Sequence, residues 1–321
     1  MMKAIVCSSY GKPDVLEVAE VEKPALADDL VLVNVRAASV NPADWYGVAG
    51  PLIVRPSTGW FKPKNDRTGI DFAGTVEAVG KDVTHLGPGD DVFGAKSGAL
   101  AEYVTVRDAV VAKPANITFE EAAAVPVAAT TALQGLRDKG QLRAGQRVLI
   151  NGASGGVGTF AVQIAKALGA EVTAVCSTRN VEQARSLGAD HVVDYTQEDF
   201  TRSDRRFDLL LDIAGGRSWS QLRRVLTPEA TVVIVGAQKR RVFGPIGHIV
   251  RLRVSSLLRG SQKAVFFIAK TNRADMEILR GWLEAGEVKP VVDRQYELAD
   301  TAEAFRYLGE GHARGKIVVT V

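Results

Sequence analysis

Small residues gather where the chain is expected to pass from a strand into a helix. Residues 151–158 read NGASGGVG, and Ala153, Gly155 and Gly158 follow the G-x-G-x-x-G spacing with alanine in the first glycine position. Glycine weakens a packed element, so this run indicates that something approaches the backbone closely. Between a strand and a helix the pattern is typical of a pyrophosphate site. The sequence predicts a bound dinucleotide, and the alternative is a tight turn that holds no ligand.

The expected phosphate loop consists of Ser154, Gly155, Gly156 and Val157. Gly155 and Gly156 would let the pyrophosphate lie against bare backbone, with the amides of the helix N-terminus pointing at the anion. Gly158 would let the helix pack closely on the strand.

The end of the next expected strand indicates which dinucleotide is bound. NAD sites usually carry an acid there, which binds the ribose 2′-hydroxyl. Here the strand EVTAVC is followed by Ser177, Thr178 and Arg179, and no acid occurs before Glu182. Two hydroxyls and a guanidinium suit a 2′-phosphate. NADPH is therefore expected, and the alternative is an ordinary polar strand end.

Apolar strands and helices alternate around this loop. A capping box at Thr118 and Glu121 opens an alanine-rich helical stretch. The strands RVLI, EVTAVC, HVVDY, FDLLLDIAG and TVVIVGA then alternate with helical segments. This order predicts an α/β fold with a doubly wound parallel sheet of the Rossmann type, over residues 120–260.

The rest of the chain is expected to form a second domain. Residues 1–119 contain short β-prone runs separated by turn signals such as GPGDD. Residues 261–321 hold two helices and two strands, and are expected to complete the nucleotide domain and to return to the first domain through the last strand, KIVVTV.

Composition bounds the class of protein. The 321 residues are 46% hydrophobic and 24% charged, the balance of a soluble globular protein, and the net charge of +3 is too small to indicate nucleic-acid binding on its own. Cys7 and Cys176 provide no disulfide framework and no metal knuckle. The N-terminus shows no signal peptide and no apolar run could span a membrane, so a cytoplasmic location is expected.

Motifs spread over nearly the whole chain resemble the medium-chain dehydrogenase/reductase superfamily, in its zinc-free NADPH:quinone oxidoreductase branch. They are KAIVCSSYGKPDVLEV, ASVNPADWY, GIDFAGTVEAVG, NGASGGVG and GHARGKIVV. The resemblance implies a GroES-like β-rich N-terminal domain and a Rossmann domain. Zinc-dependent relatives place a cysteine where this chain has Asn41, a His-Glu pair at Ile70 and Asp71, and a lobe with four cysteines. This chain lacks the first thiolate and the lobe, so no metal site is expected.

The resemblance also implies the catalytic residues. Asn41 and Tyr46 match residues of the substrate cleft, and both are expected to hydrogen-bond the substrate carbonyl. Tyr46 is also a candidate proton donor, and solvent is an equally consistent source. The alternatives are a turn-forming Asn41 before Pro42 and a core aromatic at position 46. Asp44 is expected to be an N-terminal helix residue rather than an acid catalyst.

Further cofactor contacts are implied residue by residue. Thr131 matches a residue at the nicotinamide ribose, and Tyr195 one near the adenosine phosphate. The other matching positions are Gly236, Phe266, Phe267, Arg314 and Lys316. For Lys316 the alternative is a solvated charge beside a strand.

A basic stretch at 238–263 has seven Lys or Arg residues and no acid. It is expected to form a flap over the substrate mouth with at most peripheral membrane contact, and the alternative is a loop and helix packed on the sheet edge. The four histidines, His85, His191, His248 and His312, are expected to be structural or exposed.

Together these features predict an NADPH-dependent oxidoreductase that transfers hydride to a quinone. The alternatives are a reductase of α,β-unsaturated carbonyls and a weakly active NADPH-binding protein. The expected partner is a small-molecule quinone or enone, nucleic acid is not expected, and the resemblance implies a homodimer.

Overall fold

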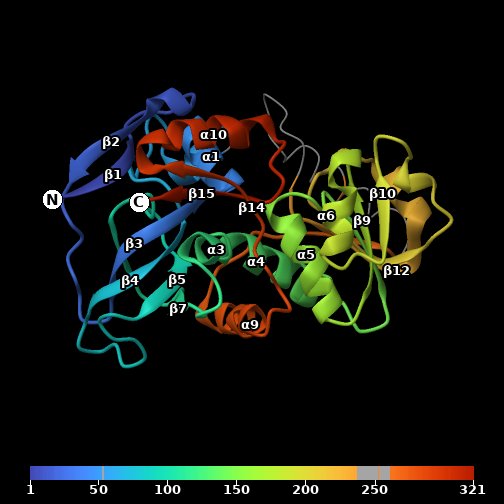
Figure 1. The fold of residues 1–321 in the computed structure, drawn as a ribbon. Coiled ribbons are helices and arrows are strands. Elements are labelled where there is room, and N and C mark those ends of the chain that lie inside the picture. The colour runs from blue at the N-terminus through green and yellow to red at the C-terminus, as the bar shows by residue number, and fades with distance from the viewer. Residues whose placement is uncertain (53, 237–251, 253–260) are drawn as a thin grey trace. The chain divides into compact units, whose positions relative to one another are not determined.

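The computed structural model describes residues 1–52, 54–236, 252 and 261–321, and its chain divides into two compact units (Figure 1). Unit 1 comprises Met1–Thr130, Lys270–Gly286 and Pro290–Val321, and unit 2 comprises Thr131–Ala269 and Glu287–Lys289. The expected boundary after residue 119 therefore lies earlier than the observed one, because the alanine-rich segment begins in unit 1. Most of the C-terminal segment also belongs to unit 1. It was expected to complete the nucleotide domain and to return to the first domain only through its last strand.

The strands of unit 1 pair antiparallel, except for β14 and β15, which are parallel to each other. A seven-stranded sheet has the order β14-β15-β3-β4-β5-β7, with β6 paired to β3, and β1 and β2 form a separate two-stranded sheet. The strands are β1 (Met2–Cys7), β2 (Leu16–Val21), β3 (Val31–Val40), β4 (Asp71–Val79), β5 (Asp91–Ala95), β6 (Tyr103–Val106), β7 (Val110–Ala112), β14 (Val292–Glu297) and β15 (Lys316–Thr320).

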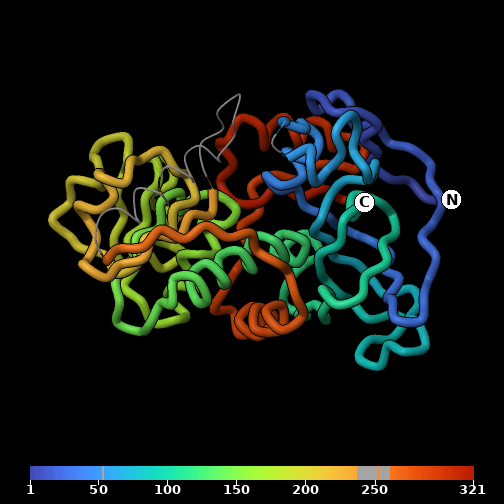
Figure 2. Tube along the Cα trace, turned by 180° about the vertical axis from the view of Figure 1, so that it is seen from behind, coloured from blue at the N-terminus to red at the C-terminus, as the bar shows by residue number. Residues whose placement is uncertain are grey.

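The last strand returns to the N-terminal sheet, as expected. β15 pairs antiparallel with β3, and Ile317 lies opposite Val40. Both ends of the chain, marked N and C in Figure 2, therefore belong to unit 1. This pairing brings Lys316 next to the residues that follow β3.

Short helices connect and cover these strands. They are α1 (Pro42–Ala49), α2 (Arg55–Thr58), α3 (Phe119–Ala123), α4 (Pro126–Leu133), α9 (Arg273–Glu284) and α10 (Thr301–Glu310), with single turns η1 (Pro13–Val15) and η6 (Leu298–Asp300). The predicted capping box is confirmed at α3, where Thr118 Oγ1 accepts from Glu121 N at 3.2 Å and Thr118 N donates to Glu121 Oε2 at 2.9 Å.

Unit 2 has the predicted parallel sheet. Its strand order is β10-β9-β8-β11-β12-β13, and every neighbouring pair is parallel. The chain order reverses between β8 and β11, the place where doubly wound sheets bind ligands at their carboxyl edge. The strands are β8 (Arg147–Asn151), β9 (Glu171–Cys176), β10 (His191–Asp194), β11 (Phe207–Asp212), β12 (Leu226–Ile234) and β13 (Lys263–Phe266).

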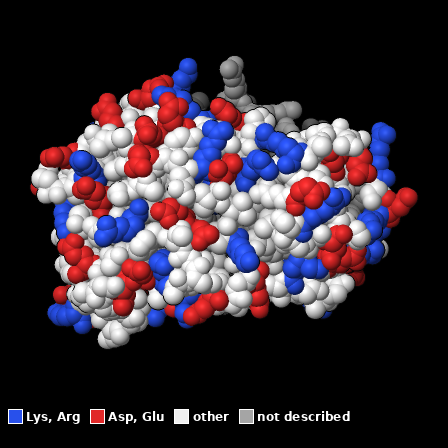
Figure 3. Space-filling model, viewed as in Figure 1, with Lys and Arg blue, Asp and Glu red and all other residues white. Residues whose placement is uncertain are grey.

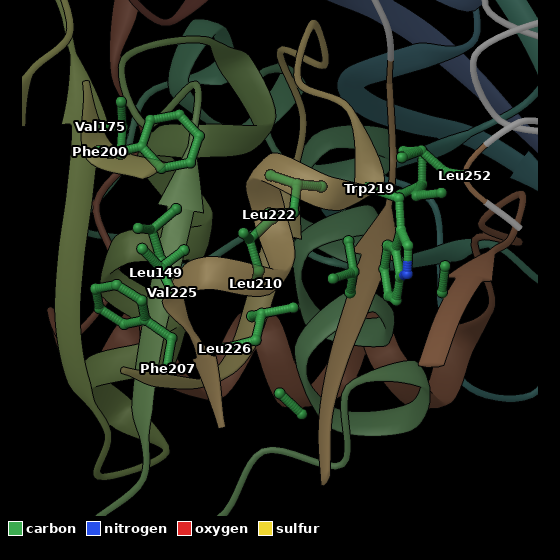
Figure 4. Packing of buried hydrophobic residues seen from close by; sticks show 14 residues of the cluster. Leu149, Val175, Phe200, Phe207, Leu210, Trp219, Leu222, Val225, Leu226 and Leu252 are labelled. Carbon is green, nitrogen blue, oxygen red and sulfur yellow. The ribbon is translucent and has the colours of Figure 1, made fainter. Parts of the chain in front are cut away.

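Helices and turns complete unit 2. They are α5 (Gly156–Ala167), α6 (Val181–Ser186), α7 (Trp219–Leu222), a π-helical segment η2 (Gln134–Lys139) and the turns η3 (Thr178–Asn180), η4 (Phe200–Arg202) and η5 (Arg223–Val225). Figure 4 shows the core of this unit, in which Leu149 of β8, Phe207 of β11 and Trp219 of α7 belong to one cluster. Burial of such side chains contributes about 1.5–3 kcal/mol each and holds the strand ends in place.

Positive and negative side chains are intermixed on the face shown in Figure 3. The predicted basic flap at 238–263 lies outside the described residues, apart from Leu252 and residues 261–263. In the described part of the chain, no helix has the length and apolar character needed to cross a membrane.

Candidate functional site

The glycine loop of unit 2 has the geometry of an anion cradle. Gly152 has φ +93°, a conformation that side chains rarely adopt, and it turns the chain after β8. Gly155 is the N-cap of α5, and a Cβ built there would meet only Gly152 O, at 3.8 Å. Packing among the described residues therefore gives no reason for a glycine at 155. Open space before the N-terminus of a helix suits a phosphate.

Gly158 has a different role in the same loop. A Cβ at this position would lie 2.1 Å from Gly152 O and 2.6 Å from the Ala153 carbonyl carbon. Only a glycine allows α5 to approach the end of β8 this closely. The structure thus separates a packing glycine at 158 from an open one at 155, as the spacing predicts.

Two buried polar residues stand at the point where the strand order reverses. Asn151, the last residue of β8, donates from Nδ2 to Asp212 Oδ1 at 2.7 Å, and Asp212 is the last residue of β11. Asp212 Oδ1 also accepts from Gly215 N at 2.9 Å. This pair was not predicted from the sequence, although each residue is the polar end of an apolar strand.

The expected 2′-phosphate residues lie together at the carboxyl ends of β9 and β10. Ser177 is half-buried, and Thr178 and Arg179 are exposed in the turn that follows β9. Thr178 Oγ1 lies 2.9 Å from Thr196 Oγ1, and Tyr195 N donates to Cys176 O at 3.0 Å. The structure therefore brings Tyr195, which is 54% exposed, to the same edge.

An acid that the sequence analysis overlooked also stands at this edge. Asp194 ends β10, and its carboxylate accepts from Thr196 N at 3.0 Å, Thr196 Oγ1 at 2.7 Å and Gln197 Nε2 at 2.8 Å. A hydrogen bond from Thr178 is the largest cause that lowers the pKa of Asp194. The carboxylate of Asp194 therefore accepts hydrogen bonds from the hydroxyls of Thr178, after β9, and Thr196, after β10.

The remaining expected cofactor residues of unit 2 are spread over its elements. Gly236 follows β12, and its N–H donates to Asp212 O at 3.3 Å, which places it at the carboxyl edge. Thr131 lies in α4 and Phe266 ends β13, and both are half-buried. The ring of Phe267 has the Lys139 ammonium 6.0 Å from its centre.

Unit 1 contains a buried cluster of polar residues around Asn41. The Asn41 amide is fixed at both ends, because Lys316 Nζ donates to its Oδ1 at 2.5 Å and its Nδ2 donates to Asp71 Oδ2 at 2.9 Å. Lys316 Nζ also lies 3.2 Å from Asp71 Oδ2. Asp71 further accepts from Ser39 Oγ at 2.9 Å and from Val127 N at 3.0 Å. An ammonium, an amide and a carboxylate therefore satisfy one another inside the unit.

The alternative of a solvated charge at Lys316 is wrong. The side chain is 4% exposed, and its ammonium is bound to Asn41 and Asp71 inside unit 1. Its position on β15, next to β3, explains this burial. Arg314 lies at the surface, with its N–H on Asp293 Oδ2 at 2.8 Å.

Asp44 begins α1 and adds a second carboxyl to the cluster. Its Oδ2 accepts from Asn41 N at 2.9 Å, so the predicted role at the helix N-terminus is confirmed. The residue is buried, and burial together with the charge of Asp71 raises its pKa to about 7. The sequence analysis did not foresee this shift.

Tyr46 lies two residues further along α1. It is half-buried, its ring meets that of Trp45 edge to face with centres 5.4 Å apart, and burial raises the pKa of its phenol. The phenol therefore stays protonated at neutral pH, and it can donate a hydrogen bond.

A cavity of about 270 Å³ lies in unit 1 beside α1. Asp44, Gly47 and Val48 of α1 form one wall, and the segment from Ser57 to Ile70 supplies most of the rest. Cys7, which is buried and whose thiol pKa burial raises, also lines it. The carboxyl of Asp44 and the loop from Ser57 to Ile70 therefore line the same cavity, which could hold a small molecule.

The described residues hold no group of three or more His, Cys, Asp or Glu side chains that could bind a metal ion. At the zinc-ligand positions of related enzymes this chain places an amide, an isoleucine and an aspartate. His191 pairs with Glu171 at 3.0 Å, and burial is the largest cause that lowers the pKa of His85. Both fit the structural role expected of the histidines, and His248 lies outside the described residues.

Two family models match the chain. The alcohol dehydrogenase GroES-like domain matches residues 27–116, and the zinc-binding dehydrogenase model matches residues 187–319. Solved structures agree over the whole chain. The quinone oxidoreductase from Coxiella burnetii has a TM-score of 0.86 and 28% identity, and covers 100% of this chain and 99% of its own. The Escherichia coli quinone oxidoreductase complexed with NADPH has a TM-score of 0.83 and 25% identity, with coverage of 99% and 100%.

Relatives of higher sequence identity are oxidoreductases. The NAD(P)H oxidoreductase RTN4IP1, mitochondrial, of Danio rerio is 35% identical, covering 100% of this chain and 92% of that protein. The 2-methylene-furan-3-one reductase of Solanum lycopersicum is 34% identical over 99% of this chain and 79% of that protein. The chain therefore belongs to the medium-chain dehydrogenase/reductase superfamily, in its quinone oxidoreductase-like branch, and is an oxidoreductase that uses a nicotinamide cofactor.

Proposed function

We propose that the protein is an NADPH-dependent reductase that transfers hydride to a quinone without zinc. The observation that carries the proposal is the open position at Gly155, which leaves the N-terminus of α5 accessible to a pyrophosphate. The second candidate function is reduction of α,β-unsaturated carbonyls. It is favoured by relatives named 2-methylene-furan-3-one reductase and NADPH-dependent alkenal/one oxidoreductase, the latter from Arabidopsis thaliana and 34% identical.

The residues present fit the cofactor. Ser154, Gly155, Gly156 and Val157 would hold the pyrophosphate through backbone amides. A 2′-phosphate would bind Ser177, Thr178 and Arg179, since hydroxyls and a guanidinium form charge-assisted hydrogen bonds to phosphate. The further proposed contacts are those of Thr131, Tyr195, Gly236, Phe266, Phe267 and Arg314. When bound, the nicotinamide supplies the hydride.

Unit 1 supplies the groups that act on the acceptor. Tyr46 donates a hydrogen bond from its protonated phenol to the acceptor oxygen, which stabilises the charge that develops there. Asn41 is fixed between Lys316 and Asp71, so the remaining hydrogen on its Nδ2 has one orientation. The Lys316 ammonium contacts both residues, and it supplies a fixed positive charge where related enzymes use a metal.

The test is steady-state oxidation of NADPH and NADH with an ortho-quinone, a para-quinone and a simple enone. Turnover with a marked NADPH preference supports the proposal, and the best acceptor separates quinone reduction from enone reduction. Tight NADPH binding without turnover of any acceptor would contradict it, and would favour the third possibility, an NADPH-binding protein of low activity.

We also propose a homodimer. In the described part of unit 2, β13 is the edge strand of the sheet beyond β12, and an open parallel edge can pair with a second copy. Analytical ultracentrifugation should give twice the mass of the chain, and a monomer at all concentrations would contradict the proposal.

A further inference from the structure

We propose that Asp44 carries the proton that completes reduction of the acceptor, and that it releases this proton into the cavity of unit 1. The carboxyl is buried at the start of α1 and lines that cavity. The inference rests on the proposed reductase function. It gives Asp44 an acid role beside its place in the first turn of α1, contrary to the expectation from the sequence, and leaves Tyr46 the hydrogen bond to the acceptor oxygen.

The two carboxyls of the cluster have unequal partners. Asp71 accepts from four donors, which are the side chains of Ser39, Asn41 and Lys316 and the N–H of Val127. Among the described residues, only Asn41 hydrogen-bonds the Asp44 carboxyl. A poorly solvated carboxyl beside a second carboxylate favours its neutral form.

The charges around Asp44 favour proton exchange at its carboxyl. The single ammonium of Lys316 lies directly on Asp71 and Asn41, so it balances one of the two carboxylates. Burial is the largest cause that raises the pKa of Asp44 to about 7, followed by the charge of Asp71. The carboxyl is therefore partly protonated at neutral pH, where a general acid is most effective.

Other titratable groups face Asp44 from the elements packed around it. Cys7 at the end of β1 lines the same cavity, and so do Lys64 and Arg67 of the loop before β4. The elements η1 and α10 also pack against α1, and their charged groups pair with one another at exposed positions: Asp14, Glu303 and Arg306. Among the described residues that line the cavity, Asp44 has the only carboxyl.

The proton balance is the same for either acceptor class. Hydride transfer adds one hydrogen and two electrons to a quinone or to the β-carbon of an enone, and leaves an oxyanion or enolate. One proton then completes the hydroquinone or the saturated ketone. The O–H bond of the Asp44 carboxyl breaks to supply it, and the carboxylate takes a proton back from cavity water.

Infrared spectroscopy tests the proton-holding group without any turnover. The wild-type protein should show a protonated carboxyl band that disappears as pH rises through about 7. Asp44→Asn should remove this band while keeping an oxygen that can accept from Asn41 N. Absence of a titrating band in the wild type, or its persistence in Asp44→Asn, would overturn the inference.

Asp275 provides a matched control. It is also a buried aspartate in the first turn of a unit 1 helix, and its carboxylate accepts from the N-cap Asn272 at 2.8 Å, but it does not line the cavity. Asp275→Asn should therefore leave the titrating band and the pH profile unchanged. If Asp275→Asn removes the band, the band belongs to another carboxyl and the inference fails.

Kinetics then test the use of the proton. In the wild type, kcat should fall as pH rises through about 7, with a solvent deuterium isotope effect on the same limb. Asp44→Asn should lower kcat about 100-fold below that pH and make it independent of pH. An unchanged rate and an unchanged limb in Asp44→Asn would overturn the role of Asp44 alone. Failure of the wild type to oxidise NADPH with any acceptor would overturn the reductase function itself. The infrared titration needs no turnover, so its result is independent of that outcome.

Discussion

Lys316 of β15 and Asp71 of β4 form an ion pair 3.2 Å long inside unit 1, with side chains that are 4% and 0% exposed. Removal of one partner from a buried pair leaves an uncompensated charge and costs about 3–5 kcal/mol. We expect Lys316→Met to lower the free energy of unfolding by this amount, measured by urea titration followed by circular dichroism.

A double variant separates the charge from the packing. Lys316→Met combined with Asp71→Asn removes both charges, so it should recover a large part of the stability lost in Lys316→Met. Additive losses from the two single changes would show that the ion pair contributes no interaction energy.

The course of the chain through the nucleotide unit could be predicted from local patterns. Gly155 precedes α5 and Gly158 lies in the first turn of that helix, and the alternation of apolar strands with helices predicted the parallel sheet. The return of KIVVTV to the first domain was also expected, and β15 pairs with β3. The loop and the parallel sheet depend on neighbours in the sequence, so pattern and spacing reveal them, whereas the return of the last strand was expected from the resemblance of the whole chain to the family.

The buried cluster could not be predicted in the same way. Asn41, Asp71 and Lys316 are separated by 30 and 245 residues in the chain, and the pairing of β15 with β3 is what brings them together. The motif at 314–316 therefore suggested a cofactor contact for Lys316, whereas the fold buries its ammonium. The raised pKa of Asp44 depends on the same long-range contact with Asp71.

Gly155→Val tests the phosphate loop. Because a Cβ at 155 meets only Gly152 O at 3.8 Å and its φ is −82°, the fold should accept the side chain. The side chain would occupy the space proposed for the pyrophosphate, so Kd for NADPH should rise at least tenfold, about 1.4 kcal/mol, in isothermal titration calorimetry. Wild-type affinity in Gly155→Val would contradict the proposed loop.

Gly158→Val is the control for the same helix. Its Cβ would collide with Gly152 O at 2.1 Å, so this change should lower Tm, whereas Gly155→Val should not. An equal loss of Tm in both variants would show that position 155 is also required for packing.

Arg179→Ala tests the cofactor preference. Arg179 lies in the turn after β9, next to Thr178, where the 2′-phosphate is proposed to bind. Hydrogen bonds to charged groups contribute about 1.5–3 kcal/mol, so KM for NADPH should rise about 10- to 100-fold and KM for NADH should not change. An equal rise for both cofactors would contradict the 2′-phosphate assignment.

The buried Asp44 carboxyl should also make stability depend on pH. Its pKa in the folded chain is about 7, above the value of 3.8 for an exposed aspartate, so the folded state binds the proton more tightly. The resulting stabilisation is complete below pH 3.8 and is lost as pH rises to about 7. Each pKa unit corresponds to about 1.4 kcal/mol, so the loss is on the order of a few kcal/mol.

Other carboxylates make stability change with pH in the opposite direction, and comparison with Asp44→Asn cancels their contribution. The free energy of unfolding of the wild type minus that of Asp44→Asn, from urea titrations across this range, should therefore decrease with rising pH and become constant above about pH 8. A difference that stays constant across the whole range would show that Asp44 titrates in the folded protein as it does in the unfolded chain.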